Sequence, residues 1–395
     1  MEAEVAVGVT KHTLFFLGSL FVVCLQLFLL NTSYAAVLPE ERADLMYHSY
    51  EGGGVKIDGP SLLIRKNFNE TVSISANYYV DAVTSASIDV TTTGASEYTE
   101  ERTEYSFSAT YLNNKSLLSA GFTSSEENDY QADTFFVSVS QDIFGDLTTV
   151  NMSYARGSDV VMQNGNDGFE ENTDRQNYRL GISQILTPNL IVGFDYEGIS
   201  DEGFLNNPYR NYRFYNDPNN INAGFSFAQE VYPDTRTSDA AAIRAAYYLP
   251  YRAAIKVDYR LFKDDWGIEA SNYSISYTHP FDNGWLIDLK YRWYEQESAD
   301  FYQDIFIYPS QNPKDYKARD KELSNYTTET WAIALSYDLA RPPFSLEKSK
   351  ISLQWDLIQF DYENFRNLDA PGNVGSEPLY NFDADVIKVF FSIWY

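Results

Sequence analysis

The sequence predicts an all-β protein, a transmembrane antiparallel up-and-down β-barrel of about 16 strands, with about 14 strands as the alternative. Three observations carry this prediction. Apolar and polar residues alternate with period two along most of the chain, connections alternate between short and long, and aromatic residues stand near the ends of the apolar faces. A soluble β-sandwich also alternates, but the aromatic ends and the asymmetry of the connections favour the membrane barrel.

The first 35 residues are typical of a secretory signal peptide. An apolar run covers 14–30, and the small residues Ser33 and Ala35 occupy the positions that signal peptidase requires before a cut. We therefore predict a signal peptide over 1–35, cleaved after Ala35, and a single barrel domain over 36–395 in the outer membrane. Because the run is only just long enough to span a bilayer, an uncleaved anchor is the alternative.

Each predicted strand has one apolar and one polar face. Over 285–293, Trp285, Leu289 and Trp293 fall on the apolar face, whereas Lys290 and Arg292 fall on the other. The same alternation recurs at 72–82, 105–111, 135–140, 178–183, 190–197, 241–249, 255–261, 273–278, 331–339 and 351–357. In a membrane barrel, the apolar face contacts lipid and the polar face lines a wet lumen.

The C-terminal part of the chain carries two further signals. Ile358, Phe360 and Tyr362 change phase after Leu357, which predicts a β-bulge. The last ten residues alternate and end on an aromatic, Tyr395. They resemble the closing strand that the barrel-assembly machinery recognises, so we expect Tyr395 to be an assembly signal and that machinery to be a partner.

The connections set the strand count and the orientation. Predicted short, periplasmic turns lie at 67–70, 113–115, 144–146, 187–189, 250–252, 280–284 and 341–349. Predicted long, extracellular loops lie at 85–101, 157–174, 200–238, 297–326 and 363–383, with briefer ones near 125–133 and 263–268. Fifteen strands follow from Val55 onward, and the count becomes sixteen if 43–50 is a strand that rises to a tight turn at 51–54, with both termini periplasmic. Fourteen is the alternative because 43–66 is weakly patterned.

Composition and charge exclude several classes of function. The chain has 56 Asp and Glu against 29 Lys and Arg, a formal charge of −27 that argues against nucleic-acid binding. With 3 His and 1 Cys, Cys24 in the signal segment, it has no zinc-ligand spacing and lacks the bases of a barrel enzyme. His48, near the outer end of the first strand, is better explained as a hydrogen-bonded strand residue. We predict no enzymatic activity and no cofactor.

The charged residues on the polar faces are the candidates for a solute pathway. Strands within 240–293 carry mostly cations, and the next two add acids, so facing walls would orient polar solutes. The alternative is that these charges pair and fill the lumen. The lumen-facing candidates are Arg244, Lys256, Asp258, Arg260, Asp288, Lys290, Arg292, Asp338 and Asp356.

Two long loops form an aromatic and basic island in this acidic chain. Loops this long within a compact protein are usually functional, so we expect loop 200–238 to narrow the pore. The candidates there and in 297–326 are Arg210, Arg213, Tyr232, Arg236, Arg319 and Lys321. Such clusters bind planar or anionic groups, and they equally form self-packed lids.

Loop 157–174 is rich in oxygen ligands. Asp167, Glu170 and Glu171 are weak candidates for a Ca²⁺ site that could tie the loop to lipopolysaccharide, although their spacing does not fit a known Ca²⁺ loop. A solvated acidic loop is the simpler interpretation.

Several blocks resemble the bacterial exported proteins grouped as domain of unknown function 3570. They are YHSYEGGGV at 47–55, SANYYVD at 75–81, NPYR at 207–210, EVYP at 230–233, Tyr259-Arg260 with DWGI at 265–268, ADFY at 299–302 and ARDKELS at 318–324. This resemblance implies an exported membrane barrel and no particular reaction.

Together these observations predict a channel or selective porin for small polar or anionic solutes. The alternative is a non-conducting barrel that acts as a scaffold or binds an envelope partner. Expected partners are outer-membrane lipids, lipopolysaccharide and the assembly machinery, and the oligomeric state stays open.

Overall fold

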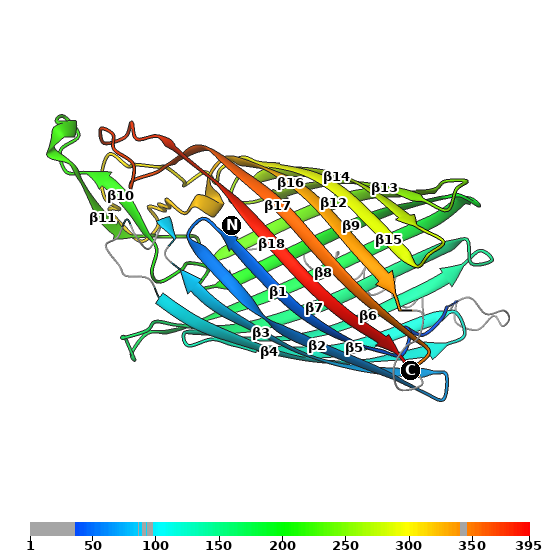
Figure 1. Ribbon diagram of the computed structural model, residues 1–395. Coiled ribbons are helices and arrows are strands. Elements are labelled where there is room, and N and C mark those ends of the chain that lie inside the picture. The colour runs from blue at the N-terminus through cyan, green and yellow to red at the C-terminus, as the bar shows by residue number, and fades with distance from the viewer. Residues whose placement is uncertain (1–35, 86, 89–91, 93–97, 340–345) are drawn as a thin grey trace.

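The computed structural model describes residues 36–85, 87–88, 92, 98–339 and 346–395 (Figure 1). The predicted signal peptide and its cleavage after Ala35 lie outside the described residues, as do parts of the connections 85–101 and 341–349. The described residues form one closed antiparallel barrel of sixteen strands and a separate two-stranded hairpin. No helix among them is long and apolar enough to cross a bilayer.

The first half of the barrel comprises β1 (Arg42–Gly52), β2 (Val55–Phe68), β3 (Val72–Ser85), β4 (Tyr98–Asn113), β5 (Ser116–Glu126), β6 (Tyr130–Ile143), β7 (Thr148–Met162), β8 (Glu170–Thr187) and β9 (Leu190–Gly203). The second half comprises β12 (Thr235–Tyr248), β13 (Ala254–Asp264), β14 (Glu269–Pro280), β15 (Trp285–Gln296), β16 (Tyr326–Asp338), β17 (Lys348–Arg366) and β18 (Leu379–Trp394). The hairpin consists of β10 (Asn211–Tyr215) and β11 (Phe225–Gln229), joined by the short helix η2 (Ile221–Ala223), and a second short helix is η3 (Lys321–Leu323).

Neighbours in the barrel are consecutive in the chain at all but two places. β9 pairs with β12, which leaves the β10–β11 hairpin outside the wall. β1 pairs with β18 from Arg42↔Trp394 to Gly52↔Ala384, which closes the barrel. The predicted first strand and tight turn are confirmed. Gly53 and Gly54 both have positive φ, as a two-residue hairpin turn of this kind requires.

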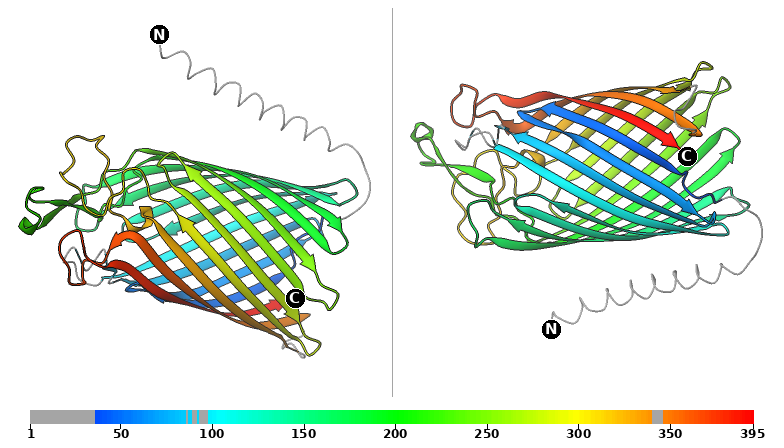
Figure 2. Two further views of the ribbon diagram at one scale, coloured as in Figure 1. Left: turned by 90° about the horizontal axis from the view of Figure 1, so that it is seen from above. Right: turned by 60° about the horizontal axis from the view of Figure 1, so that its bottom comes forward.

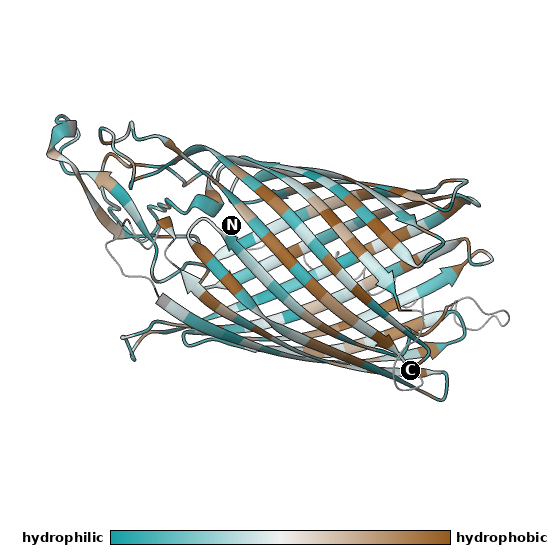
Figure 3. Ribbon diagram, viewed as in Figure 1, coloured by the Kyte–Doolittle hydropathy of each residue, from teal (hydrophilic) through white to brown (hydrophobic). Residues whose placement is uncertain are grey.

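The alternation in the sequence becomes two faces of the wall, seen in Figure 3 as brown and teal residues that alternate along each strand. Val257, Ile275 and Tyr291 are cross-strand partners on the outer face. Leu289, two residues along β15 from Tyr291, is 42% exposed. An apolar surface that continues around a whole barrel would be unfavourable in water, and it fits the hydrocarbon of a bilayer.

Outward aromatic residues pack in pairs across neighbouring strands. Trp285, at the start of β15, packs on Tyr337 near the end of β16 with ring centroids 4.9 Å apart, and the mid-strand residues Tyr291 and Trp331 pack at 4.6 Å. The pair at the strand ends suits the interface between hydrocarbon and headgroups, where an apolar body and a polar edge are both satisfied.

The predicted β-bulge after Leu357 is wrong. The register of β17 with both neighbours is regular from 350 to 361 and shifts only between Asp361 and Arg366. Phe360 and Tyr362 therefore remain on the inner face. They are aromatic there because this part of β17 lies in an apolar core, where Phe360 stacks on Phe382 at 4.5 Å.

The predicted long loop 157–174 is also shorter than expected. β7 runs to Met162 and β8 begins at Glu170, so only 163–169 connect them. Both strands extend past the apolar band into segments in which apolar and polar residues no longer alternate. The sequence pattern therefore stops before the strands do, and it placed the end of β7 too early and the start of β8 too late.

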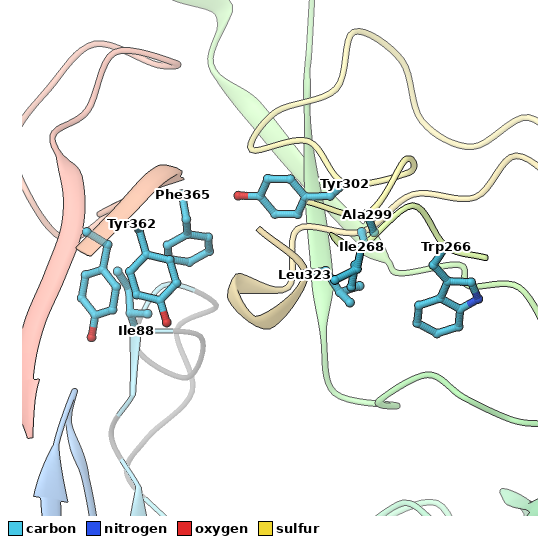
Figure 4. Packing of buried hydrophobic residues seen from close by; sticks show 10 residues of the cluster. Ile88, Trp266, Ile268, Ala299, Tyr302, Leu323, Tyr362 and Phe365 are labelled. Atoms are coloured by element: carbon cyan, nitrogen blue, oxygen red, sulfur yellow. The ribbon is translucent and has the colours of Figure 1, made fainter. Parts of the chain in front are cut away.

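The main apolar core of the described residues lies at the barrel end that carries the long loops, which we call the mouth. Its members come from several connections that are distant in sequence (Figure 4). They are Ile88, Trp266, Ile268, Ala299, Tyr302, Ala318, Leu323, Tyr362, Phe365 and Tyr380. The membrane-spanning part of the lumen is lined by polar residues, so the connections at the mouth bury most of the apolar surface that is hidden from solvent.

We expect Tyr395→Asp to prevent most of the protein from entering the membrane. The Tyr395 hydroxyl donates to the carbonyl of Arg65 at 2.9 Å, and the Lys66 ammonium lies 5.0 Å from its ring centroid. The substitution removes an interfacial anchor beside the closing pair of strands. The measurement is the amount of heat-modifiable barrel in the outer-membrane fraction. Tyr395→Phe keeps the ring and should insert, and normal levels of Tyr395→Asp would contradict the prediction.

Candidate functional site

A cavity of about 1690 Å³ opens just inside the mouth. Its lining comes from the inner ends of strands around most of the barrel, though not from β1, β17 or β18, and from segment 204–210 and residues 320–323. It is larger than the pockets of roughly 300–1,000 Å³ that hold drug-sized ligands. Both charged and aromatic side chains reach it, which makes it the first candidate for a solute site.

Segment 204–210 joins distant parts of the rim. The Tyr209 hydroxyl donates to Asp129 in the β5–β6 turn and accepts from the backbone N–H of Asn164 at 2.7 Å. Its neighbour Arg210 forms an ion pair with Asp320 beside η3. The segment therefore links the β5–β8 side of the rim to loop 297–325.

The β10–β11 hairpin projects beyond the mouth, away from the lumen, in all three views (Figures 1 and 2). The prediction that loop 200–238 narrows the pore therefore needs a correction. Only the flanks of the hairpin, including Arg210, Tyr232 and Arg236, line the cavity, together with Lys321 from the other loop.

Arg213 and Arg319 do not line this cavity. Arg213 is 0% exposed and forms ion pairs with Asp304 and, at 2.7 Å, with Glu377. Arg319 is buried on the ring of Phe365, with its guanidinium 4.2 Å from the ring centroid. The sequence allowed two interpretations of the aromatic and basic loops, a binding site for planar or anionic groups and a self-packed lid. Arg213 and Arg319 fit the self-packed lid.

These contacts lock three connections together. Arg213 belongs to the hairpin, Asp304 to loop 297–325, and Glu377 to the β17–β18 loop. The guanidinium of Arg319 also donates to the Arg366 carbonyl at 2.8 Å. We call the buried ion pairs of Arg213 with Asp304 and Glu377 the charge lock. A buried charge that loses its partner is strongly destabilising, so the charge lock holds the three connections in one arrangement.

Glu230 has an unusual environment at the base of the hairpin. It is 3% exposed, accepts from the Tyr232 hydroxyl at 2.7 Å, and accepts from the Arg319 backbone N–H at 2.6 Å. Burial, and then the negative charge of Asp320, raise the pKa of Glu230 to about 7, while Arg210 opposes the shift. This carboxyl therefore titrates near neutral pH.

On the lumen wall, the strand register puts the predicted cations on the inner face. Arg244 pairs with Asp195 and Arg260 with Glu197, the latter at 2.8 Å. Among the described residues, by contrast, no ion pair forms at Lys256, Lys290 or Arg292, and the Arg292 guanidinium lies 5.5 Å from the ring centroid of Tyr294.

The predicted lumen acids are more dispersed. Asp288 accepts from the Thr278 hydroxyl, and Asp356 accepts from the Gln354 amide at 2.9 Å. Asp258 faces inward between the rows of Lys256 and Arg260. Asp338 lies at the opposite end from the mouth, 3.6 Å from Lys348 and 3.7 Å from Lys350. The structure therefore does not bring these acids together as one wall.

The weak Ca²⁺ candidates do not assemble. Glu170 and Glu171 are consecutive in β8 and point to opposite faces, while Asp167 lies in the preceding turn. Among the described residues, the acidic group whose ligand atoms lie within 4.8 Å of one another consists instead of Glu100, Glu127 and Asp129. Sequence reasoning missed this group because its members come from β4 and from the β5–β6 turn, and only the strand register brings them together.

His48 is a hydrogen-bonded wall residue. Its Nε2 lies 2.7 Å from an Asp81 carboxylate oxygen, and its ring stacks on Tyr79 with centroids 4.8 Å apart. The sequence favoured this role for it over a catalytic one.

Arg213→Met should release the hairpin without opening the barrel. It leaves Asp304 and Glu377 buried without their cation, which costs about 3–5 kcal/mol for a buried pair. Hydrogen exchange should become faster across β10, β11 and loop 297–325, while heat-modifiable mobility stays normal. Adding Asp304→Asn and Glu377→Gln should restore part of the protection. Unchanged exchange in Arg213→Met would show that the lock does not hold the loops.

The loops should open more easily at pH 8 than at pH 5. Because Glu230 has a raised pKa, the closed mouth binds more protons than the open one between its ordinary value of 4.5 and about 7. The stability of the closed mouth therefore falls as pH rises through this window and is level above it. Proteolysis of the hairpin at several pH values measures the slope, and Glu230→Gln should flatten it. An equal slope in Glu230→Gln would assign the effect to another group.

Comparisons with known proteins find similar solved structures and one matching family. A solved structure described as a bacterial polysaccharide outer membrane secretin covers 91% of this chain and 100% of its own, with a TM-score of 0.50 and 6% identity. A Pseudomonas aeruginosa FadL homologue covers 90% of both chains, with a TM-score of 0.41 and 8% identity. P. aeruginosa OpdK with vanillate covers 91% of this chain and 100% of its own, with a TM-score of 0.42 and 10% identity.

At such identities, the likeness to the secretin shows the fold alone, that of an outer-membrane β-barrel. No curated protein matches the sequence. Residues 94–390 match a family described as protein of unknown function (DUF3570). Two of the sequence blocks that resemble this family, at 47–55 and 75–81, lie before the matched range. Because the match covers most of the chain, the protein is a member of the DUF3570 family.

Proposed function

We propose that this protein is an outer-membrane channel for small polar solutes and that its lumen favours solutes with negative charge. Among the described residues, the three cations Lys256, Lys290 and Arg292 face the lumen without an ion-pair partner, and this observation carries the proposal. The chain has a formal charge of −27, so carboxylates far outnumber cations. Cations that face the lumen without a carboxylate partner are therefore not expected by chance.

The register places these cations close together. Lys256 and Lys290 are both cross-strand partners of Ser276, one on each side of it. Arg292 follows Lys290 on the same face, about 7 Å along the strand. Asp288 also faces inward on β15, but it already accepts from Thr278. A mobile anion could therefore approach this wall.

Much of the opposite wall offers hydroxyl groups. The Ser75 and Ser108 hydroxyls are 2.7 Å apart, and those of Thr110 and Ser119 are 2.9 Å apart. A barrel of this strand number is too wide for side chains to fill, so water must occupy the space between the walls. Cations on one side and neutral hydroxyls on part of the other give a field across the pore, which orients charged solutes.

The location and the contacts of the protein are part of the same proposal. We expect export with cleavage after Ala35, residence in the outer membrane among lipids and lipopolysaccharide, and insertion by the barrel-assembly machinery.

One observation favours the alternative function, a non-conducting scaffold. The β10–β11 hairpin stands clear of the barrel and is fixed by the charge lock, as a partner-binding element would be (Figure 2). Phe227 on this hairpin and Tyr308 on loop 297–325 are exposed.

Replacing the three unpaired cations by glutamine should lower the anion-to-cation permeability ratio by roughly threefold, because fixed positive charge no longer attracts anions into the lumen. The reversal potential of purified protein in a planar bilayer under a salt gradient measures this ratio. Arg252→Gln is the matched control, since Arg252 is an exposed turn residue at the other end that pairs with Asp282. Conductance with an unchanged ratio would remove the selectivity claim. Folded protein without conductance would favour the scaffold.

A further inference from the structure

Three neighbouring strands carry a compact polar patch on the lumen wall. The strand register aligns its members in two rows across β13, β14 and β15. They are Asp258, Ser274 and Arg292 in the row nearer the mouth, and Lys256, Ser276 and Lys290 in the next row. Four charged side chains thus surround two serines, and we call this set the lumen patch.

The strand spacing sets the size of the lumen patch. Neighbouring strands lie about 4.8 Å apart, so Asp258 and Arg292 are about 10 Å apart, with only the short side chain of Ser274 between them. The row of Lys256 and Lys290 lies about 7 Å farther along the strands. The patch therefore has the dimensions of a small solute, with charges at its corners and two hydroxyls as its floor.

The four charged groups of the lumen patch form no ion pair with any residue that the structure describes. Their neighbours, by contrast, are already engaged. Arg244 and Arg260 are held by two carboxylates of β9, and Asp288 accepts from the Thr278 hydroxyl. Asp258 is the direct cross-strand partner of Arg244, but Arg244 pairs with β9 instead. The charges of the patch therefore remain available to a solute.

The lumen patch carries three positive charges and one negative charge. A simple anion bound there is attracted by the cations and repelled by Asp258. A solute with two carboxylates and one ammonium group instead gives every charge a partner of opposite sign. Arg292 presents a planar fork that matches one carboxylate, whereas the two lysines approach the other as point charges. The charge pattern therefore matches that of an acidic amino acid.

We infer that the lumen patch binds acidic amino acids. The ammonium group lies at Asp258, the α-carboxylate at Arg292, and the side-chain carboxylate between Lys256 and Lys290. The inference rests on the proposed function and names the class of anion that the lumen selects.

The dimensions of glutamate fit this arrangement. Its ammonium nitrogen and its α-carboxylate oxygens lie about 3 Å apart, and a charge-assisted hydrogen bond adds about 3 Å at each end, so the molecule spans roughly the 10 Å between Asp258 and Arg292. Its second carboxylate lies about 5 Å from the first. The flexible stems of the two lysines cover the rest of the 7 Å step between the rows. The Ser276 hydroxyl, between the lysines, is a further donor to this carboxylate.

The test is binding of four probes to the purified full-length barrel in detergent at low ionic strength, measured by isothermal titration calorimetry. Each probe other than L-glutamate lacks one of its charged groups. Glutarate lacks the ammonium, 4-aminobutyrate lacks the α-carboxylate, and L-glutamine lacks the side-chain charge. L-glutamate should bind about tenfold more tightly than each of the other three, since each has lost one charged contact. Equal affinity for L-glutamate and glutarate would overturn the inference.

Three variants assign each charged contact. Asp258→Asn should weaken L-glutamate about tenfold and tighten glutarate, because glutarate has no ammonium and is repelled by the carboxylate of Asp258. Arg292→Gln should weaken L-glutamate and leave 4-aminobutyrate unchanged. Lys256→Gln with Lys290→Gln should weaken L-glutamate and leave L-glutamine unchanged. Arg252→Gln, at the opposite end of the barrel from the mouth, is the control and should change none of the affinities. A variant that weakens all four probes equally would overturn the assignment of its residue.

Conductance separates this inference from the function on which it rests. If the barrel conducts ions and does not distinguish L-glutamate from the other probes, the amino-acid site is wrong and the channel stands. If L-glutamate is preferred and the barrel does not conduct, the amino-acid site stands and the channel is wrong.

Discussion

The structure depends on one constraint: inside a bilayer, each backbone N–H and C=O must find a partner within the protein. An open sheet leaves two unpaired edges, and this chain removes them by pairing β1 with β18 along eleven residue pairs. Once the ring of hydrogen bonds is complete, side chains are free to differ on the two faces. The outer face meets lipid, and the inner face carries the charges on which the proposed function rests.

Closure also decides where an apolar core can form. A wet lumen cannot hold one, so the core of this protein lies at the mouth, where connections from several hairpins meet. The same region holds the buried Arg213 with Asp304 and Glu377. Apolar packing brings the loops together without direction, whereas buried ion pairs accept one geometry only. The cavity beneath them therefore has a defined lining, as a selective site requires.

Much of this architecture could be predicted from the sequence because alternation is local. Trp285, Leu289 and Lys290 reveal their faces from their immediate neighbours, and the even strand count follows from closure. Arg213 could not be assigned in the same way, since its partners are distant in the chain. The β-bulge was wrongly predicted at Phe360 and Tyr362 because this part of β17 lies beyond the membrane-spanning region. There the inner face packs into the apolar core at the mouth, so an inward aromatic residue is favourable. The acidic group around Glu127 depends on cross-strand proximity, which no local pattern encodes.

The pairing of β1 with β18 joins the first strand of the barrel to the last, so closure must be a late step in folding. Each hairpin joins strands that are adjacent in the chain, but the ring cannot close until β18 is also present to pair with β1. Until then two strand edges stay open, and each is a template for pairing with another chain. The apolar outer faces are equally uncovered during this interval. The newly made chain therefore avoids aggregation only if the free edges of β1 and β18 are kept from pairing with other chains until they pair with each other.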